Sequence, residues 1–433
     1  MRRLVALFAS IALVIFVSLL SSCGSTSSSN ATNNAPPASS SNPPSGSGSG
    51  SGSGSASGGG SSGSSGSGSA GSGSSSGSGS GSSSSFVAYA YTGGQNEIRA
   101  YGVSANGTLT AVAGSPYAIT NPKFATTPVA TNGANLYAVS DAGTNLNVFS
   151  IDKSTGSLTL ANKTNALAGD PHNLDFVSGL ALDHTGASLY VVVGVSDFDG
   201  GFNLFTVGSS SGAQQSQYLQ TGAFAEAPLV FSANNQFGYS FLCTARIDGI
   251  FGYARASDGS LTKMNLGLVF GPKVTGQAFC PDALAVSARG YLAGVWKVNG
   301  MGSSVPGNET YLMTHAINSD GTLTAISDSQ VQTASTSAHA VAANFDPTGT
   351  FLAVAGDGGI QTYSLNGNGT LTAMGSPQAA GANFQSVAWD KANHVFAATS
   401  DQLYVFTANN GALTPVPGSP YPGDPALTVL PLQ

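Results

Sequence analysis

The residues able to do acid–base chemistry are few in this 433-residue chain, which has five histidines and only 8% charged residues. His172 and His339 could each act as a general base towards an attacking water, and Arg246 could stabilise negative charge developing on a carbonyl oxygen. The alternative for each histidine, and the commoner role, is a loop residue hydrogen-bonded to the backbone. Further candidates for a ligand-binding face are Glu226, Asp248, Lys273 and Lys297. Whether these side chains meet depends on the fold.

Other chemistries find little support in the sequence. Asp197-Phe198-Asp199-Gly200 imitates the start of a calcium loop, but the downstream glutamate and the intermediate ligands are missing, which favours an ordinary turn. The glycine-rich stretch 356–359 lies between strands and opens no helix, so it does not indicate a phosphate cradle. We find no metal-spaced histidine pair and no serine nucleophile elbow. We therefore expect no metal and no cofactor.

The N-terminus indicates export and a membrane tether. Met1-Arg2-Arg3 and the apolar run from Leu4 to Leu20 have the pattern of a secretory signal, here residues 1–22. Residues 20–23, Leu-Ser-Ser-Cys, resemble the lipobox of bacterial lipoproteins, which implies that Cys23 is lipidated and becomes the new N-terminus. The alternative is an uncleaved anchor, because the run approaches the ~20 residues that span a bilayer.

A low-complexity segment follows the lipobox. Residues 45–85 contain 39 Gly or Ser in 41 positions, and residues 24–85 carry no charge. Such a chain cannot bury enough apolar surface to offset the entropy of ordering, so we expect 23–85 to be a disordered linker after the lipidated cysteine. This linker is either a spacer that separates the folded part from the membrane or a low-complexity segment whose only requirements are length and solubility.

A short element recurs through residues 86–433, the remaining domain. Its six clear copies contain Gly-x-Leu-Thr at a turn between alternating segments: 106–110, 155–159, 258–262, 320–324, 368–372 and 410–414. A degenerate copy lies at 211–213. Most copies carry Asn-Gly or Asp-Gly, which supplies the positive φ of a hairpin turn. Successive glycines are 42 to 62 residues apart, which is the length of one four-stranded unit.

Four strands per repeat and seven repeats predict an all-β, seven-bladed β-propeller. In the third repeat the strands are expected at Ser178–Asp183, Leu189–Gly194, Phe202–Val207 and Gln214–Leu219. The first repeat lacks its innermost strand, since Phe86–Thr92 already resembles a second strand. Ala426–Leu432 is a spare strand after the last hairpin, so the C-terminal strand should close the ring and hide its edges.

Several phrases resemble the lactonase-type seven-bladed propellers, the family of bacterial 6-phosphogluconolactonase and fungal carboxymuconate cyclase. They are 106–117 (NGTLTAVAGSPY), 346–355 (DPTGTFLAVA) and 189–191 (LYV). The resemblance covers 86–433 and implies the fold strongly and the reaction weakly. Where the active family members have Gly-Pro-Arg-His and Asn-Glu, blade four has Ala227-Pro228-Leu229-Val230 and Leu242-Cys243. The charged and titratable groups of the family motif are thus replaced by apolar residues in blade four.

Propeller topology assigns each polar residue to one of two faces. Connections from an outer to the next inner strand, and from second to third strand, share the face on which the channel opens; we call it the channel face. His172, His339 and Arg246 should lie there, together with Glu226, Asp248, Lys273, Lys297, Asp141, Asp357 and Asp401. His184 and His394 should lie on the opposite face, and His315 inside a third strand.

The two cysteines that remain after Cys23 should form a disulfide. Cys243 ends the second strand of blade four, and Cys280 precedes the inner strand of blade five, expected at Asp282–Ser287. Both fall on the channel face of neighbouring blades, in a protein that matures in an oxidising compartment. The alternative is a pair of buried, inert thiols.

Taken together, the sequence predicts an exported, lipid-anchored binding or scaffolding module at the cell envelope, in the periplasm or at the cell surface. The alternative is a lactonase for an unphosphorylated sugar lactone. Expected partners are membrane lipid through Cys23 and a protein, glycan or small molecule at the channel mouth, with the chain itself monomeric. Without Arg2 and Arg3 the net charge is 11 − 20 = −9, which excludes nucleic acid as a favoured partner.

Overall fold

The computed structural model describes residues 86–120, 128–169, 176–194, 201–208, 212–221, 229–243, 248–266, 269–299, 309–327, 329–333 and 340–432. The signal peptide, Cys23 and the linker up to residue 85 lie outside these residues and stay predictions. In the part of the chain that is described, no helix is long and apolar enough to cross a membrane.

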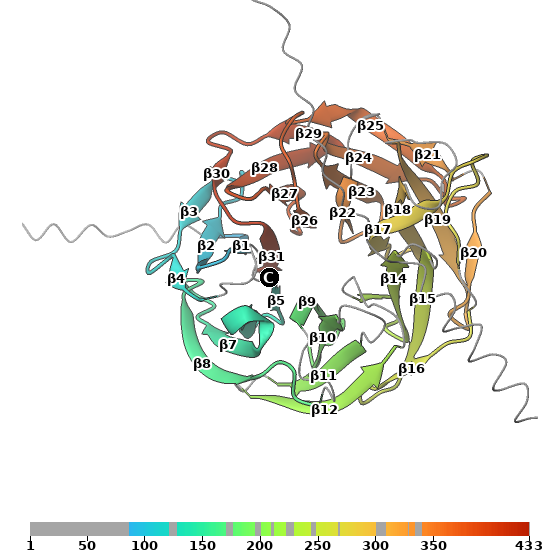
Figure 1. The fold of residues 1–433 in the computed structure, drawn as a ribbon. Helices are drawn as coiled ribbons and strands as arrows, with labels where there is room; N and C mark the ends of the chain where they lie inside the picture. Colours follow the sequence, from blue (N-terminus) through green and yellow to red (C-terminus); the bar gives the residue numbers. More distant parts are fainter. Residues whose placement is uncertain are drawn as a thin grey trace, which may run out of the picture. The chain divides into compact units, whose positions relative to one another are not determined.

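Seven antiparallel sheets form the blades of a ring (Figure 1). Blade one contains β1 (Ala88–Gly93), β2 (Glu97–Val103), β3 (Leu109–Ala111), β4 (Tyr117–Ala118) and the last strand, β31 (Ala426–Pro431). Blade two contains β5 (Val129–Thr131), β6 (Asn135–Ser140), β7 (Asn145–Ile151) and β8 (Leu158–Asn165), with a 3-10 turn, η1 (Asp141–Gly143), between β6 and β7. Blade three contains β9 (Phe176–Leu182), β10 (Ser188–Gly194), β11 (Gly201–Val207) and β12 (Ala213–Gln220).

The remaining four blades follow in chain order. Blade four contains β13 (Val230–Phe231), β14 (Phe237–Cys243), β15 (Asp248–Arg255) and β16 (Leu261–Lys263). Blade five contains β17 (Phe279–Val286), β18 (Tyr291–Val298), β19 (Thr310–Ile317), β20 (Leu323–Ala325) and β21 (Val331–Gln332). Blade six contains β22 (Ala340–Phe345), β23 (Phe351–Gly356), β24 (Gly359–Leu365) and β25 (Leu371–Gln378). Blade seven contains β26 (Ser386–Trp389), β27 (His394–Ala398), β28 (Gln402–Asn409), β29 (Ala412–Pro415) and β30 (Tyr421–Pro422).

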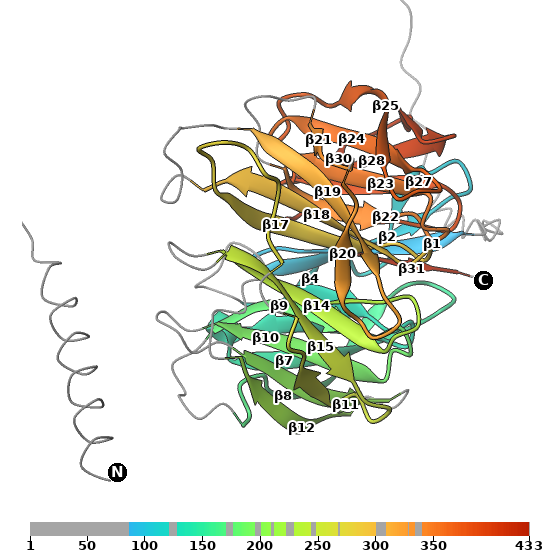
Figure 2. The same cartoon turned by 90° about the vertical axis from the view of Figure 1, so that its right-hand side faces the viewer.

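The predicted propeller and its closure are confirmed. β31 pairs antiparallel with β1, in a register that sets Ala88 opposite Pro431 and Gly93 opposite Ala426. Figure 2 shows the two ends of the domain side by side at this point. The last strand thus becomes the innermost strand of blade one, and the pairing removes the exposed edge of β1.

The Gly-x-Leu-Thr hairpins of blades four and five are each hydrogen-bonded to the blade before them. In blade five the carbonyl of Gly321 accepts a hydrogen bond, 2.9 Å long, from the hydroxyl of Tyr239 in blade four. Gly321 has φ +80°, and a Cβ there would lie 2.3 Å from the ring of Phe237. Tyr190 makes the same bond, 2.7 Å long, to Gly259 one blade earlier. Only glycine combines a positive φ with the space for such a close contact, which explains why the turn recurs.

The core lies between neighbouring blades. Val295 and Leu312 of blade five pack in one cluster with Leu352 and Tyr363 of blade six, and all four side chains are buried. Burying a large apolar side chain contributes roughly 1.5–3 kcal/mol. Because each sheet buries its two faces against its neighbours, the blades depend on one another for stability.

Candidate functional site

Several predicted site residues lie outside the described part of the chain. These are His172, Glu226, Arg246 and His339. Their structural roles stay predictions. Among the described residues, two of the expected positions, Asp248 and Lys297, lie on the neighbouring blades four and five.

A row of four residues crosses from blade four to blade five on the channel face. Asp248, the first residue of β15, lies opposite Cys243 of β14. Cys280 of β17 lies opposite Lys297 of β18. A disulfide joins Cys243 to Cys280, with 5.1 Å between their Cα atoms. Sequence alone places the start of β17 later, but the strand begins at Phe279 and so includes Cys280. In the strand register, the disulfide therefore places Asp248 of blade four and Lys297 of blade five in a single row.

Lys297 forms an ion pair at this edge. Its Nζ lies 2.7 Å from Oδ1 of Asp282, and the two side chains are 33% and 15% exposed. Asp282 sits where the β17–β18 register shifts between Pro281 and Ala283. Such a bulge leaves one residue outside the ladder and re-aims its side chain. The sequence pattern gives no sign of the shift, so Asp282 was missed as a site residue.

One oxygen of this carboxylate is unsatisfied. Oδ2 of Asp282 is buried, and no hydrogen-bond donor of the described residues reaches it. A buried carboxylate oxygen without a donor is costly, so a water or a ligand hydroxyl that enters beside it gains a strong hydrogen bond. Lys273, the remaining predicted cation, lies exposed in the connection before β17.

The positions that hold polar groups in the lactonase family belong to the core and the disulfide here. Leu229 and Leu242 are buried, at 4% and 1% exposure, and Cys243 is bonded to Cys280. Ala227 and Pro228 lie outside the described residues. Blade four therefore has no arginine at Leu229, no histidine at Val230 and no carboxylate at Cys243.

Blade one carries a charged cluster that the sequence pattern does not indicate. Arg99 near the start of β2 places Nε 3.3 Å from Oδ2 of Asp424, in the connection that leads to β31. The Thr92 hydroxyl donates to the same oxygen at 3.0 Å. Burial raises the pKa of Asp424, and Arg99 partly opposes this. Arg99 is thus a cation in addition to the predicted Arg246, which lies outside the described residues. Arg99 and Asp424 are 325 positions apart, so only ring closure brings them together.

Three histidines lie away from this face, as expected. His394 is buried, with Nδ1 2.7 Å from Oδ2 of Asp390. His315 is buried within β19, and among the described residues neither ring nitrogen has a hydrogen-bond partner. Burial lowers the pKa of His315 to about 4. Neither histidine is accessible to a substrate.

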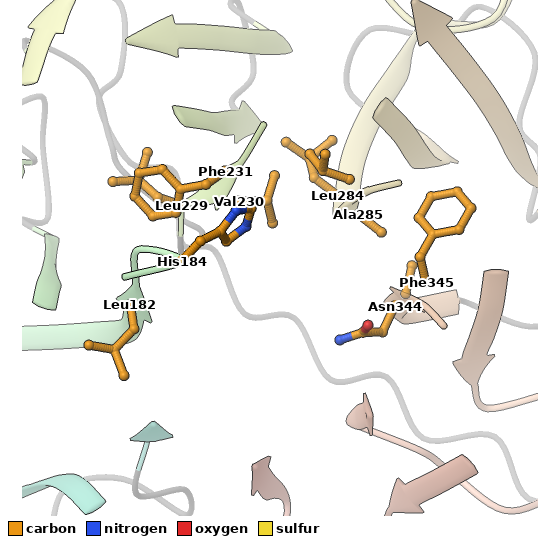
Figure 3. Close-up of a pocket in the computed structure, with 11 residues that line it drawn as sticks. Leu182, His184, Leu229, Val230, Phe231, Leu284, Ala285, Asn344 and Phe345 are labelled. Carbon is orange, nitrogen blue, oxygen red and sulfur yellow. The ribbon is translucent and has the colours of Figure 1, made fainter. Parts of the chain in front are cut away.

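His184 lines a cavity of about 220 Å³ at the ends of the inner strands (Figure 3). Its imidazole and the amide of Asn344 come from different blades and flank the opening, with Leu182, Phe231 and Phe345 among the other lining residues. His184 is the lone titratable side chain of this lining. A base without a cation beside it provides no stabilisation for an oxyanion, so this cavity is the weaker candidate for hydrolysis.

No protein-family model and no curated protein sequence matches the chain. Solved structures match it across the folded part. The periplasmic gluconolactonase of Pseudomonas aeruginosa has a TM-score of 0.59 at 18% identity, covering 80% of this chain and 99% of its own. A Bacteroides uniformis protein provisionally named a 6-phosphogluconolactonase has a TM-score of 0.56 at 18% identity, covering 79% and 99%. A protein of the same provisional name from Bacteroides fragilis has a TM-score of 0.56 at 14% identity, covering 79% and 98%.

These likenesses concern the fold. The chain has the architecture of the lactonase-type seven-bladed propellers, as the repeat phrases of its sequence predict.

Proposed function

We propose that this propeller hydrolyses an unphosphorylated sugar lactone at the channel face of blades four and five. The observation that carries the proposal is the ion pair of Lys297 and Asp282 beside the disulfide, on an architecture shared with a protein named as a gluconolactonase. The pair supplies a cation and a carboxylate within 2.7 Å of each other at the edge of an inner strand.

The two side chains have separate roles in this proposal. A water attacks the lactone carbonyl carbon and gives a proton to Oδ2 of Asp282, the oxygen without a hydrogen-bond donor among the described residues. Lys297 stabilises the negative charge on the carbonyl oxygen. Collapse of the intermediate breaks the ring C–O bond, and the ring oxygen takes up the proton. The product is the open hydroxy acid.

An unphosphorylated substrate fits blade four better than a phosphorylated one. A phosphate needs arginine forks or several donors, whereas Leu229 and Leu242 are part of the core. The net charge of −9 without the signal peptide also disfavours a dianionic substrate. The earlier expectation of a pure binding module keeps one observation in its favour: no histidine of the described residues accompanies Lys297.

We further propose that the propeller acts outside the cytoplasm, tethered through lipidated Cys23. The signal-like residues 1–22 support export, and the linker to residue 85 would hold the domain away from the membrane. A disulfide between Cys243 and Cys280 fits an oxidising compartment.

The test is acid release from two lactones by the full-length chain in detergent. Glucono-δ-lactone should be hydrolysed well above the buffer blank, and 6-phosphogluconolactone should stay near the blank. Binding of gluconolactone without turnover would support the binding module instead. Turnover of the phosphorylated lactone at a similar or higher rate would contradict the substrate assignment.

A further inference from the structure

A second cavity opens on blade seven, away from Lys297 on blade five. It has a volume of about 520 Å³, within the roughly 300–1,000 Å³ typical of small-molecule sites. One wall is the connection from β25 to β26, residues 379–383, which begins Ala-Ala-Gly-Ala. The other is the turn between β27 and β28. The polar and aromatic lining consists of Asn383, Thr399, Ser400, Asp401, Gln402 and Tyr404.

Tyr404 provides a fixed aromatic surface in this cavity. Its ring meets that of Phe384 edge to face, with centroids 5.1 Å apart, and lies parallel to the ring of Phe406 at 6.4 Å. Its hydroxyl donates to Oε1 of Gln402 at 2.8 Å. Phe384 and Phe406 are buried, whereas Tyr404 is half-buried. A ring held from two sides by buried aromatics loses little entropy when a ligand packs on it.

The turn between β27 and β28 presents hydrogen-bonding groups to the same cavity. Asp401 is exposed, and its Oδ1 accepts the Thr399 hydroxyl at 3.1 Å. The Thr399 hydroxyl in turn accepts the backbone N–H of Gln402 at 3.0 Å. This small network orders the turn. Asn383, which is also exposed, adds an amide to the lining of the same cavity.

We propose that this cavity binds a neutral saccharide of one or two rings. A pyranose has apolar C–H faces that pack on an aromatic ring and vicinal hydroxyls that a carboxylate and amides bind together. The side chains that line the cavity include one carboxylate, Asp401, and no cation, so a sugar acid or sugar phosphate is repelled. The small residues Ala380 and Gly381 leave room for the ring.

This inference is independent of the proposed hydrolysis. The cavity lies between blades six and seven, and the lactone site lies on blades four and five. A variant that fills the cavity should keep lactone turnover. Ala380→Trp suits this purpose, because Ala380 is exposed and lines the cavity, so the larger side chain need not displace the core.

Calorimetric titration of the full-length chain in detergent tests the proposal. The probes are methyl β-D-glucoside, cellobiose, maltose and N,N′-diacetylchitobiose, with glucuronate as the anionic comparison. At least one neutral probe should bind. Asp401→Asn and Tyr404→Ala should each weaken it by about tenfold, the loss of one charged hydrogen bond or one aromatic contact. Tyr404→Phe should retain most of the affinity, and Ala380→Trp should abolish binding.

Asp320→Asn is the matched control, because Asp320 lies in the exposed hairpin turn of blade five. It removes the same charge and should leave saccharide affinity unchanged. The proposal is overturned if none of the four neutral probes binds, or if glucuronate binds as tightly as they do. It is equally overturned if Asp401→Asn, Tyr404→Ala and Ala380→Trp, all with unaltered melting temperatures, bind like the parent protein.

Discussion

Cys243 and Cys280 join the second strand of blade four to the innermost strand of blade five, and each lies opposite a charged residue of its own sheet. The bond thus sits between Asp248 and Lys297. In the chain-entropy model, closing a span of 37 residues stabilises the fold by roughly 3–4 kcal/mol. The staple also limits relative movement of the two blades that carry the proposed lactone site.

Thiol titration tests this bond in the exported chain with Cys23 lipidated. The denatured, unreduced protein should show no free thiol, and two should appear after reduction. Two free thiols before reduction would exclude the bond. Cys243→Ala with Cys280→Ala should lower the free energy of unfolding by the same 3–4 kcal/mol, roughly. A double variant as stable as the parent would show that the disulfide contributes nothing to the free energy of unfolding.

Ring closure by β31 predicts a sharp contrast between the two ends of the domain. Deleting residues 426–433 removes the innermost strand of blade one and exposes the edge of β1, so the melting temperature should fall severely. Deleting residues 1–85 removes no strand of any blade and should leave it unchanged. Thermal unfolding followed by circular dichroism measures both. An unaltered melt after the C-terminal deletion would overturn the closure.

The bond between Tyr239 and the Gly321 carbonyl predicts that the hairpins couple the blades. Tyr239→Phe should cost about 1 kcal/mol of unfolding free energy, the net value of one hydrogen bond. Gly321→Ala should cost more, because it adds a clash with Phe237 to a positive φ. Gly212→Ala, at the degenerate hairpin where a Cβ meets nothing within 4 Å, is the control and should be nearly neutral. Denaturant titration of the three variants checks the order.

His315 predicts acid sensitivity in a defined window. Its pKa is about 4 in the folded protein against 6.5 for an ordinary histidine, so between these values the unfolded chain binds more protons and stability rises with pH. Above pH 6.5 His315 is neutral in both states and costs no stability on this account. As the pH falls from 6.5 to 4, proton uptake by the unfolded chain lowers the free energy of unfolding by about 3 kcal/mol. His315→Leu should lose less stability over this window than the parent, in denaturant titrations at pH 4.5 and 7. Equal losses would place the acid sensitivity elsewhere.

The ring and its closure could be predicted from the sequence because the same glycine turn recurs in six of the seven blades. In the six clear copies the hairpin glycine has a positive φ and lies against the neighbouring blade, so the same turn recurs; Gly212 of the degenerate copy has neither property. The short strands β4, β21 and β30 were not predicted. Each has two residues and pairs with the third strand of its blade, too short for an alternating pattern.

The candidate site was predictable only in part. The strand bounds agree with the predicted positions of Asp248 and Lys297, because β15 begins at Asp248 and β18 ends one residue after Lys297. Asp282 was not found, since a register shift leaves no mark in the hydrophobic pattern. Tyr404 and Asn383 were missed because a sugar-sized cavity depends on how two connections fold against each other. The pairing of Arg99 with Asp424 required closure of the whole ring.

The most direct test of the proposed lactonase is the turnover of glucono-δ-lactone by Lys297→Met, with Lys153→Met as the matched control. Lys153 is exposed in the turn between β7 and β8 and carries the same charge. Removing the group that stabilises an oxyanion typically costs about 10²–10³ in kcat. The account predicts a loss of at least about a hundredfold for Lys297→Met, with an unchanged melting temperature, and parental activity for Lys153→Met. Parental turnover in a folded Lys297→Met variant would contradict it.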